Sequence, residues 1–128
     1  MADSGPTTVE IGRQVESLVC DYLQQEGLRI VERNYRSPRG EVDLIMRDGS
    51  VLVFVEVRYR RNPRFGTGAD TVTRAKQDKL VKTALYYLQH HPRHAHWPTR
   101  FDVVSVSAPD RQPEWQVEWI RDAFQAGS

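Results

Sequence analysis

The 128-residue sequence lacks several features that would narrow its class. It has a single cysteine, Cys20, so an internal disulfide is excluded. Its first residues, MADSGPTTVEIG, have neither the basic start nor the apolar core of a secretory signal, and no window approaches the apolar length of a membrane span. We therefore expect a cytoplasmic protein without membrane association, folded as a single domain over residues 1–128 with its core at about residues 8–122.

A large charge of one sign is also absent, because the formal net charge is only +1. The protein is therefore not a general binder of polyanions, and any affinity for nucleic acid must come from a local patch or a bound metal. Among its 18 basic residues only Lys76, Lys79 and Lys82 are lysines. Arginine is therefore abundant, and an isolated arginine carries little information.

The spacing of apolar residues predicts a helix, three strands, a second helix and one or two further strands. Val15, Val19 and Leu23 share one helical face, and this first helix is expected to end near Gly27. A second helix runs through residues 81–88, and the prolines of HHPRHAHWP terminate it. Strands are expected at residues 28–36, 41–46, 51–59, 100–106 and 115–120.

The most apolar run, VLVFVEVRY, contains one carboxylate, Glu56, between two valines. Between this run and the preceding strand stands Asp48–Gly49, a pair typical of a two-residue hairpin turn. A turn at these two residues places Asp43 opposite Phe54 and Glu41 opposite Glu56. The hairpin thus predicts acidic residues close to the buried-looking Glu56.

Because side chains alternate along a strand, Glu41, Asp43 and Glu56 are expected on one side of the hairpin together with Arg58. An unpaired ionised carboxylate in an apolar environment costs several kcal/mol, so a positive charge is expected there. Two interpretations stay open: a divalent cation joins the carboxylates, or Arg58 alone balances Glu56 while Asp43 is solvated. The first helix favours the cation, because Glu16 lies at the edge of its apolar stripe and can point towards the sheet.

Further motifs follow in a fixed order: Gly12-xxx-Glu16, GEVDLI with Asp43, VFVEVRYR with Glu56 and Arg58, TRAKQDKL with Lys76, and RFDVV. Over roughly residues 10–122 this series resembles the YraN-like family of uncharacterised bacterial proteins. That family is similar to the restriction-endonuclease-like PD-(D/E)XK superfamily, and especially to Holliday junction resolvases. The resemblance implies a restriction-endonuclease-like α/β fold, with a mixed central β-sheet flanked by helices in the order α-β-β-β-α-β(-β).

The resemblance also implies that Glu16, Asp43 and Glu56 bind one or two Mg²⁺ or Mn²⁺ ions. Hard oxygen ligands without a thiolate favour Mg²⁺ independently. The implied function is a metal-dependent endonuclease that hydrolyses phosphodiester bonds in branched or structured DNA. A two-fold dimer would place two such sites on two strands.

The superfamily usually has lysine two residues beyond the glutamate, where this sequence has Arg58. A guanidinium stays protonated, so Arg58 can stabilise a transition state but cannot accept a proton from water. Lys76, at the rim of the second helix, has two open interpretations: it replaces the missing lysine, or it is a solvated helix charge.

The segment RYRRNPRFGTG follows the strand that carries Glu56 and has arginines interleaved with aromatic residues. We expect it to contact phosphates and to stack a base, although a solvated loop is an equally open interpretation. The expected nucleic-acid-binding residues are Arg58, Arg60, Arg61, Arg64, Lys76 and Lys79.

Two other groups are interpreted as structural. The histidines of HHPRHAH are expected in an exposed loop rather than in a Zn²⁺ site, and Asp102 is expected to pair with Arg100 or a loop amide. Two alternatives to the nuclease stay open: a catalytically silent nucleic-acid-binding module on a nuclease-like scaffold, and a protein-interaction subunit whose acids only stabilise the fold.

Overall fold

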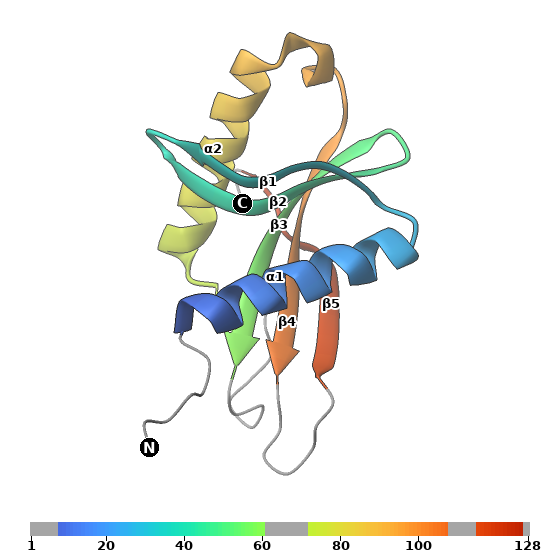
Figure 1. Cartoon of the computed structure of the whole chain (residues 1–128). Helices are drawn as coiled ribbons and strands as arrows, with labels where there is room; N and C mark the ends of the chain where they lie inside the picture. The colour runs from blue at the N-terminus through green and yellow to red at the C-terminus, as the bar shows by residue number, and fades with distance from the viewer. Residues whose placement is uncertain (1–7, 61–71, 108–114, 127–128) are drawn as a thin grey trace, which may run out of the picture.

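The computed structural model describes residues 8–60, 72–107 and 115–126. Their elements follow the order α-β-β-β-α-β-β (Figure 1), as expected from the sequence, with both of the final strands present. The elements are α1 (Thr8–Gln25), β1 (Arg29–Ser37), β2 (Gly40–Asp48), β3 (Val51–Arg60), α2 (Arg74–His90), the 3-10 helix η2 (Pro92–His94), β4 (Thr99–Ser107) and β5 (Gln116–Phe124). In these described ranges no helix is long and apolar enough to cross a membrane.

The strands form one five-stranded mixed sheet in the order β1-β2-β3-β4-β5. Neighbouring strands are antiparallel except for β3 and β4, which are parallel. Parallel strands need a long crossover connection, and α2 lies within the connection between β3 and β4. The result is the α/β fold with a mixed sheet flanked by helices that the family resemblance implies.

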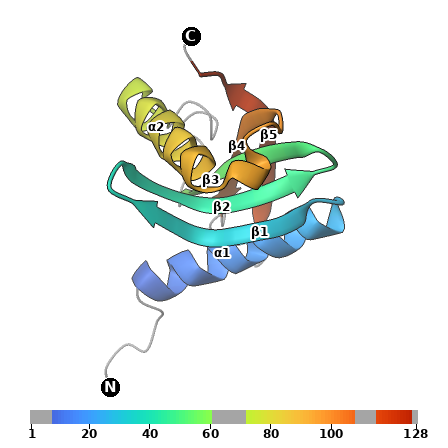
Figure 2. The ribbon, with the colours of Figure 1, turned by 90° about the horizontal axis from the view of Figure 1, so that it is seen from above.

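The two helices cover opposite faces of the sheet (Figure 2). Strand alternation along β3 explains why both faces are apolar: Val53 and Val55 pack in the cluster under α1, whereas Leu52 and Phe54 pack in the cluster under α2. Glu56 continues the face towards α2 and is the last residue of the buried run 52–56 of β3. The buried acid therefore lies at the end of a core strand, on the side that α2 covers.

Local capping fixes where each helix begins and ends. At the C-terminus of α1 the N–H of Leu28 donates to the carbonyl of Leu23, and Gly27 has a φ of +102°, which together form a glycine C-cap of the Schellman type. At the N-terminus of α2 the hydroxyl of Thr73 accepts a hydrogen bond of 3.2 Å from the N–H of Lys76. This cap places Lys76 in the first turn of α2.

The turn between β2 and β3 differs from the expected one. Asp48 pairs with Val51, so the two turn residues are Gly49 and Ser50. Gly49 takes the position with a φ of +59°, whereas Asp48 stays in its strand and forms an ion pair of 2.9 Å with Arg100. The glycine therefore occupies the first turn position rather than the second.

The register of the hairpin consequently differs by two residues from the expected one. Phe54 pairs with Ile45, so the predicted opposition of Asp43 with Phe54 and of Glu41 with Glu56 is wrong. A shift of two residues keeps Leu44, Ile45 and Met46 on their predicted faces, because side chains alternate with a period of two. The alternation is interrupted before Leu44, since Val42 packs in the cluster under α2. The effect of the shift is to bring Asp43 beside Glu56.

Candidate active site

The candidate site lies where β2 and β3 separate. Their pairing ends at Leu44 and Val55. Beyond this point the side chain of Asp43 bridges the strands, because its Oδ2 accepts a hydrogen bond of 2.8 Å from the N–H of Val57. The carboxylate thus satisfies a backbone donor that a continuing ladder would have paired with a carbonyl, and it is held next to Glu56.

Glu56 is the most buried acid of this site, with a side chain only 6% exposed. Its Oε2 lies 3.4 Å from Nη1 of Arg58, two residues along the same strand. The same oxygen lies 3.5 Å from Nζ of Lys76, which α2 supplies from its first turn. Cationic groups from two different elements therefore contact one carboxylate oxygen.

The neighbouring carboxyl of Asp43 has an altered affinity for protons. Burial, followed by the charge of Glu56, raises the pKa of Asp43 to about 7. The N–H of Val57 and the ammonium of Lys76 oppose this change, whereas a hydrogen bond between the two carboxyl groups reinforces it. Near neutral pH the Asp43 carboxyl is consequently protonated in part of the molecules.

Glu16, on α1, faces Asp43 and, more weakly, Glu41. Burial raises its pKa first, and the charge of Asp43 raises it next. A hydrogen bond with the side chain of Asn34 and the charge of Arg33 act in the opposite direction. The helix therefore adds a third carboxyl to the environment of Asp43, and we call Glu16, Asp43 and Glu56 the carboxylate site.

Asn34 is a residue of this region that the sequence reasoning missed. It lies inside β1 with a φ of +53°, a left-handed conformation that asparagine tolerates better than most residues, and it hydrogen-bonds Glu16. Asparagine within a strand was the only available signal, since β1 continues on both sides of it.

The donor set of the carboxylate site suits a hard cation. Mg²⁺ is usually bound through one or two carboxylates and keeps several waters, and its remaining ligands come from substrate phosphates. Asp43 and Glu56 fit this requirement, since they are adjacent and their mutual repulsion is relieved by positive charge. Across the described ranges, no three His, Cys, Asp or Glu side chains are grouped closely enough to form a complete cage, so Glu16 stands as an outer member.

The structure brings four of the expected site residues together: Asp43, Glu56, Arg58 and Lys76. Of the two interpretations of Lys76, its contact with Glu56 favours a role in the site over that of a solvated helix charge. Arg60 ends β3, and Lys79 follows Lys76 by one turn of α2. The expected contacts of Arg61 and Arg64, with the rest of the RYRRNPRFGTG loop beyond Arg60, lie outside the described residues.

Glu41 does not lie opposite Glu56. It pairs with Arg36 across β1 and β2, and its Oε2 lies 3.4 Å from Nε of that arginine. Both side chains are well exposed. The cause is the shifted turn, which moves Glu41 past the end of the pairing between β2 and β3.

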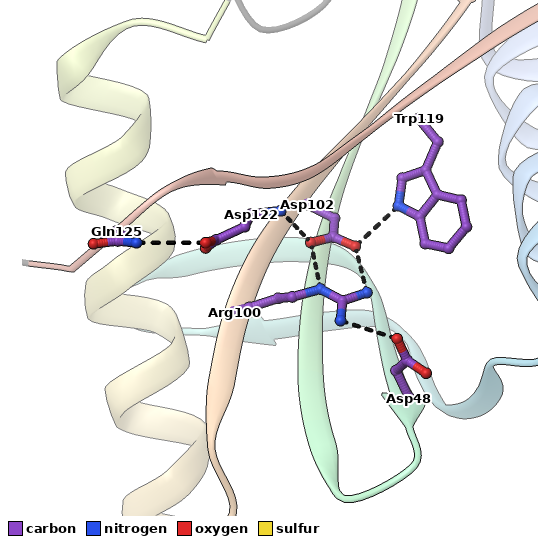
Figure 3. Close-up of polar contacts among 6 residues, drawn as sticks. All are labelled: Asp48, Arg100, Asp102, Trp119, Asp122 and Gln125. Atoms are coloured by element: carbon purple, nitrogen blue, oxygen red, sulfur yellow. Dashed lines mark hydrogen bonds and ion pairs between the residues drawn. The ribbon is translucent and has the colours of Figure 1, made fainter.

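Asp102 is fully buried and belongs to a separate network of polar contacts (Figure 3). Arg100 donates from Nε and Nη2 to its two oxygens at 2.9 and 3.1 Å. Trp119 Nε1 and the N–H of Asp122 donate at 2.9 Å each. The expected pairing with Arg100 is confirmed. The amide that donates to Asp102 belongs to Asp122 of β5, not to a loop as expected.

The histidines near the end of α2 stack on aromatic rings. The ring of His91 lies 3.8 Å from that of Tyr87, and His94 lies 4.4 Å from Trp97, centroid to centroid. Nδ1 of His94 is 3.0 Å from the hydroxyl of Tyr87. Burial, followed by the charge of His91, lowers the pKa of His94. These contacts give the segment a packing role.

Many proteins are similar in sequence to this chain, and the relatives named below carry the same family description. Residues 15–106 match the family described as "Uncharacterised protein family UPF0102". A UPF0102 protein of Nitrosococcus oceani is 47% identical over 117 residues, which cover 91% of this chain and 93% of the relative. UPF0102 proteins of Stutzerimonas stutzeri and Vibrio campbellii are 46% and 44% identical, with 90% and 92% of this chain and 94% of each relative covered.

Among solved structures, Pyrococcus furiosus SfsA in complex with Ca²⁺ is a distant neighbour. The TM-score is 0.32 and the identity 12%, and the aligned part covers 86% of this chain and 62% of that one. A similarity this low carries no argument about the present chain.

Proposed function

Because the chain belongs to the uncharacterised protein family UPF0102, whose name states no reaction, we propose its function from the chemistry of the carboxylate site. We propose that it is a metal-dependent endonuclease that hydrolyses phosphodiester bonds in DNA. Branched or structured DNA is the proposed substrate, and Mg²⁺ or Mn²⁺ the proposed cofactor.

One observation carries this proposal: Asp43 and Glu56 are held in contact although their charges repel. The pKa of Asp43 is raised to about 7 by burial and by Glu56, so the protein without a cation carries an electrostatic cost at neutral pH. Acid pairs with such shifts are concentrated at functional sites. A divalent cation between the two carboxylates would remove the cost.

Mg²⁺ bound at this site would act as a Lewis acid that activates a water and stabilises charge on the scissile phosphate. Asp43 and Glu56 would hold it, and Glu16 would orient the outer ligands from α1. The guanidinium of Arg58 is suited to stabilise the phosphate, because it offers several donors and stays protonated. Its contact with Glu56 places it at the site without requiring it to move a proton.

Lys76 is proposed to supply the lysine that β3 lacks. Its ammonium lies 3.5 Å from Oε2 of Glu56, although it comes from a helix rather than from the strand of Glu56. The N-cap at Thr73 fixes the first turn of α2, so the position of Lys76 does not depend on a flexible loop. From there the ammonium can donate hydrogen bonds to a phosphate oxygen or to the leaving group.

The test is cleavage of labelled four-way junction, flap, single-stranded and linear duplex DNA with Mg²⁺ or Mn²⁺. Native protein is compared with Asp43→Asn and Glu56→Gln, and with Asp78→Asn as a control for an exposed acid on α2. We expect metal-dependent cutting that is lost in the two site variants and kept in the control. Cutting that survives in both site variants would overturn the proposal.

A second candidate function rests on a different observation. Arg58 and Lys76 both contact Glu56 and so supply positive charge without any metal. This arrangement is compatible with a catalytically silent DNA-binding module. Salt-sensitive DNA binding that is unchanged by EDTA, together with an absence of cleavage, would favour it.

A further inference from the structure

A pocket of about 380 Å³ lies between the tip of the β1–β2 hairpin and the first turns of α2. Its charged lining residues are Arg36, Glu41, Lys76 and Lys79, and Gly40 forms part of its wall. We call it the hairpin–helix pocket. It is distinct from the carboxylate site but shares Lys76 with it.

The pocket exists because the hairpin tip packs closely against the helix, as both views of the ribbon show (Figures 1 and 2). Gly40 has a φ of +144°, and a Cβ at this position would come within 3.0 Å of the hydroxyl oxygen of Thr83. That hydroxyl is fixed by a hydrogen bond of 2.8 Å to the carbonyl of Lys79. Only glycine allows this approach without strain, so the wall of the pocket is built into the backbone.

The lining of the pocket is positively charged. Among the lining residues that the structure describes, Arg36, Lys76 and Lys79 accompany one carboxylate, that of Glu41, so the positive charges exceed the negative by two. The pair between Arg36 and Glu41 is well exposed and therefore weak. In the described part of the chain no carboxylate lies within ion-pair distance of the Lys79 ammonium.

The position of Lys76 connects this charge to the carboxylate site. Its side chain lines the pocket, and its ammonium lies 3.5 Å from Oε2 of Glu56. A nucleic-acid strand whose phosphate lies at Glu56 would therefore carry a neighbouring phosphate towards the pocket. Lysine and arginine groups from two elements match the several oxygens of one phosphate group.

We propose that the hairpin–helix pocket binds a phosphate group of the DNA strand, next to the phosphate at the carboxylate site. This inference rests on the proposed function for its substrate class, and it adds a second point at which the strand is held. Two anchored phosphates fix the direction of a strand, which one phosphate cannot do. The pocket phosphate is either an internal phosphodiester or a terminal phosphomonoester.

Binding of fluorescein-labelled single-stranded oligonucleotides, measured by anisotropy in EDTA, tests the proposal without any need for turnover. Lys79→Ala is compared with Lys82→Ala, a lysine of the same helix that lines a different pocket with Arg39 and Leu85. We expect Lys79→Ala to weaken binding about three- to tenfold and to lower the salt slope by about 0.7, the value for one phosphate contact on single strands. Lys82→Ala is expected to leave the binding affinity and the salt slope within about 1.5-fold of their native values.

A variant that is expected to tighten oligonucleotide binding strengthens the test. Glu41→Gln removes the one carboxylate among the described residues that line the pocket, and it frees Arg36 from its ion pair. We expect tighter oligonucleotide binding, by about two- to fivefold, and no such gain when Lys79→Ala is also present. A purely structural role of Glu41 would not increase affinity. Equal effects of Lys79→Ala and Lys82→Ala, or weaker binding by Glu41→Gln, would overturn the proposal.

Oligonucleotides with a 5′-phosphate, a 3′-phosphate or only hydroxyl ends identify the source of the phosphate. If the pocket takes a terminal phosphate, one phosphorylated end binds more tightly to native protein, and Lys79→Ala removes the difference. If it takes an internal phosphate, Lys79→Ala weakens all three equally, relative to Lys82→Ala. Either result supports the pocket even if no DNA is cut in Mg²⁺, so failure of the nuclease proposal and failure of the pocket are distinguishable.

Discussion

Asp43 and Asp102 occupy comparable places in the sheet, and their surroundings differ. Each accepts a hydrogen bond from a backbone N–H where strand pairing is interrupted. Asp43 accepts from Val57 beyond the last pair of β2 and β3, and Asp102 accepts from Asp122 at an irregularity between β4 and β5. The local backbone role is therefore the same for both side chains.

The two regions differ in what else faces the carboxylate. Asp102 receives two hydrogen bonds from Arg100 and one from Trp119, so each of its oxygens is satisfied by donors. Asp43 faces a second carboxyl, that of Glu56, and its pKa is raised to about 7. The first arrangement stabilises the fold, whereas the second needs a proton or a cation. Burial of an acid alone thus does not identify a functional site; the sign of its neighbours does.

The largest effect is expected from Asp102→Asn. The change removes the buried one of the two negative charges that pair with Arg100, and it turns one acceptor into a donor that faces other donors. We expect the free energy of unfolding, measured in urea, to fall by about 3–5 kcal/mol, as for a broken buried ion pair. Asp78→Asn, at an exposed ion pair, is the control and should change it by no more than about 0.5 kcal/mol. A loss below about 1 kcal/mol would contradict the structural role of Asp102.

Asp43→Asn is expected to raise the free energy of unfolding instead of lowering it. In the folded protein Asp43 keeps its proton up to about pH 7, whereas in the unfolded chain it loses the proton near 3.8. Between these values the folded state binds more protons, so stability falls as pH rises through this range and stays low above it. Asparagine resembles the protonated acid, so Asp43→Asn does not lose this stability as the pH rises.

Urea unfolding at pH 5 and pH 8, in EDTA, measures the difference in stability between Asp43→Asn and the native protein. We expect Asp43→Asn to be more stable than the native protein by about 1–3 kcal/mol at pH 8, with a smaller gain at pH 5. Destabilisation at pH 8 comparable to that of Asp102→Asn would show that the two regions are electrostatically alike, and the comparison would fail.

A divalent cation should affect the two regions differently. At a concentration ten times its Kd, Mg²⁺ or Mn²⁺ bound to the folded state adds about 1.4 kcal/mol, or roughly 4–8 °C in Tm for a chain of this size. The shift should be larger at pH 8 than at pH 6, because protons compete for Asp43 below its pKa of about 7. Asp43→Asn should abolish the shift, and NaCl at equal ionic strength should not reproduce it. A shift that persists in Asp43→Asn would place the cation elsewhere.

The fold and the faces of its strands could be predicted from the sequence, because apolar periodicity fixes both. Glu56 and Arg58 share the face expected from strand alternation, and Asp43 lies at the same site. The hairpin register could not be predicted, because Gly49 suits a two-residue turn equally well as its second residue, after Asp48, or as its first residue, before Ser50. The ion pair between Asp48 and Arg100, 52 residues apart, is a tertiary contact that keeps Asp48 in its strand.

The acidic residues of the site were predicted from the sequence more fully than its cationic residues and the residues that position them. The contact of Lys76 with Glu56 depends on how α2 crosses the sheet, which local patterns do not determine. The left-handed conformation of Asn34 lies inside a strand pattern in which the residue type alone gives a sign of it. The hairpin–helix pocket depends on the approach of Gly40 to Thr83, a distance between elements far apart in the sequence.

The smallest effect on stability is expected from Lys76→Met. Because Lys76 is 38% exposed, its pair with Glu56 contributes at most about 1 kcal/mol, so the free energy of unfolding should stay within that range of the native value. Metal affinity should nevertheless increase, by about two- to fivefold, because the variant loses a positive charge that competes for Oε2 of Glu56.

Calorimetric titration with Mn²⁺ measures this affinity, with Lys82→Met as the matched control on the same helix. DNA cleavage by Lys76→Met should fall at the same time, since the proposed phosphate contact is lost. Tighter metal binding with weaker cleavage would separate the two roles of Lys76, and it is a combination that a purely structural ion pair does not produce. Weaker metal binding would mean that Lys76 positions Glu56 instead of competing for it, and the carboxylate site would then resemble the network around Asp102.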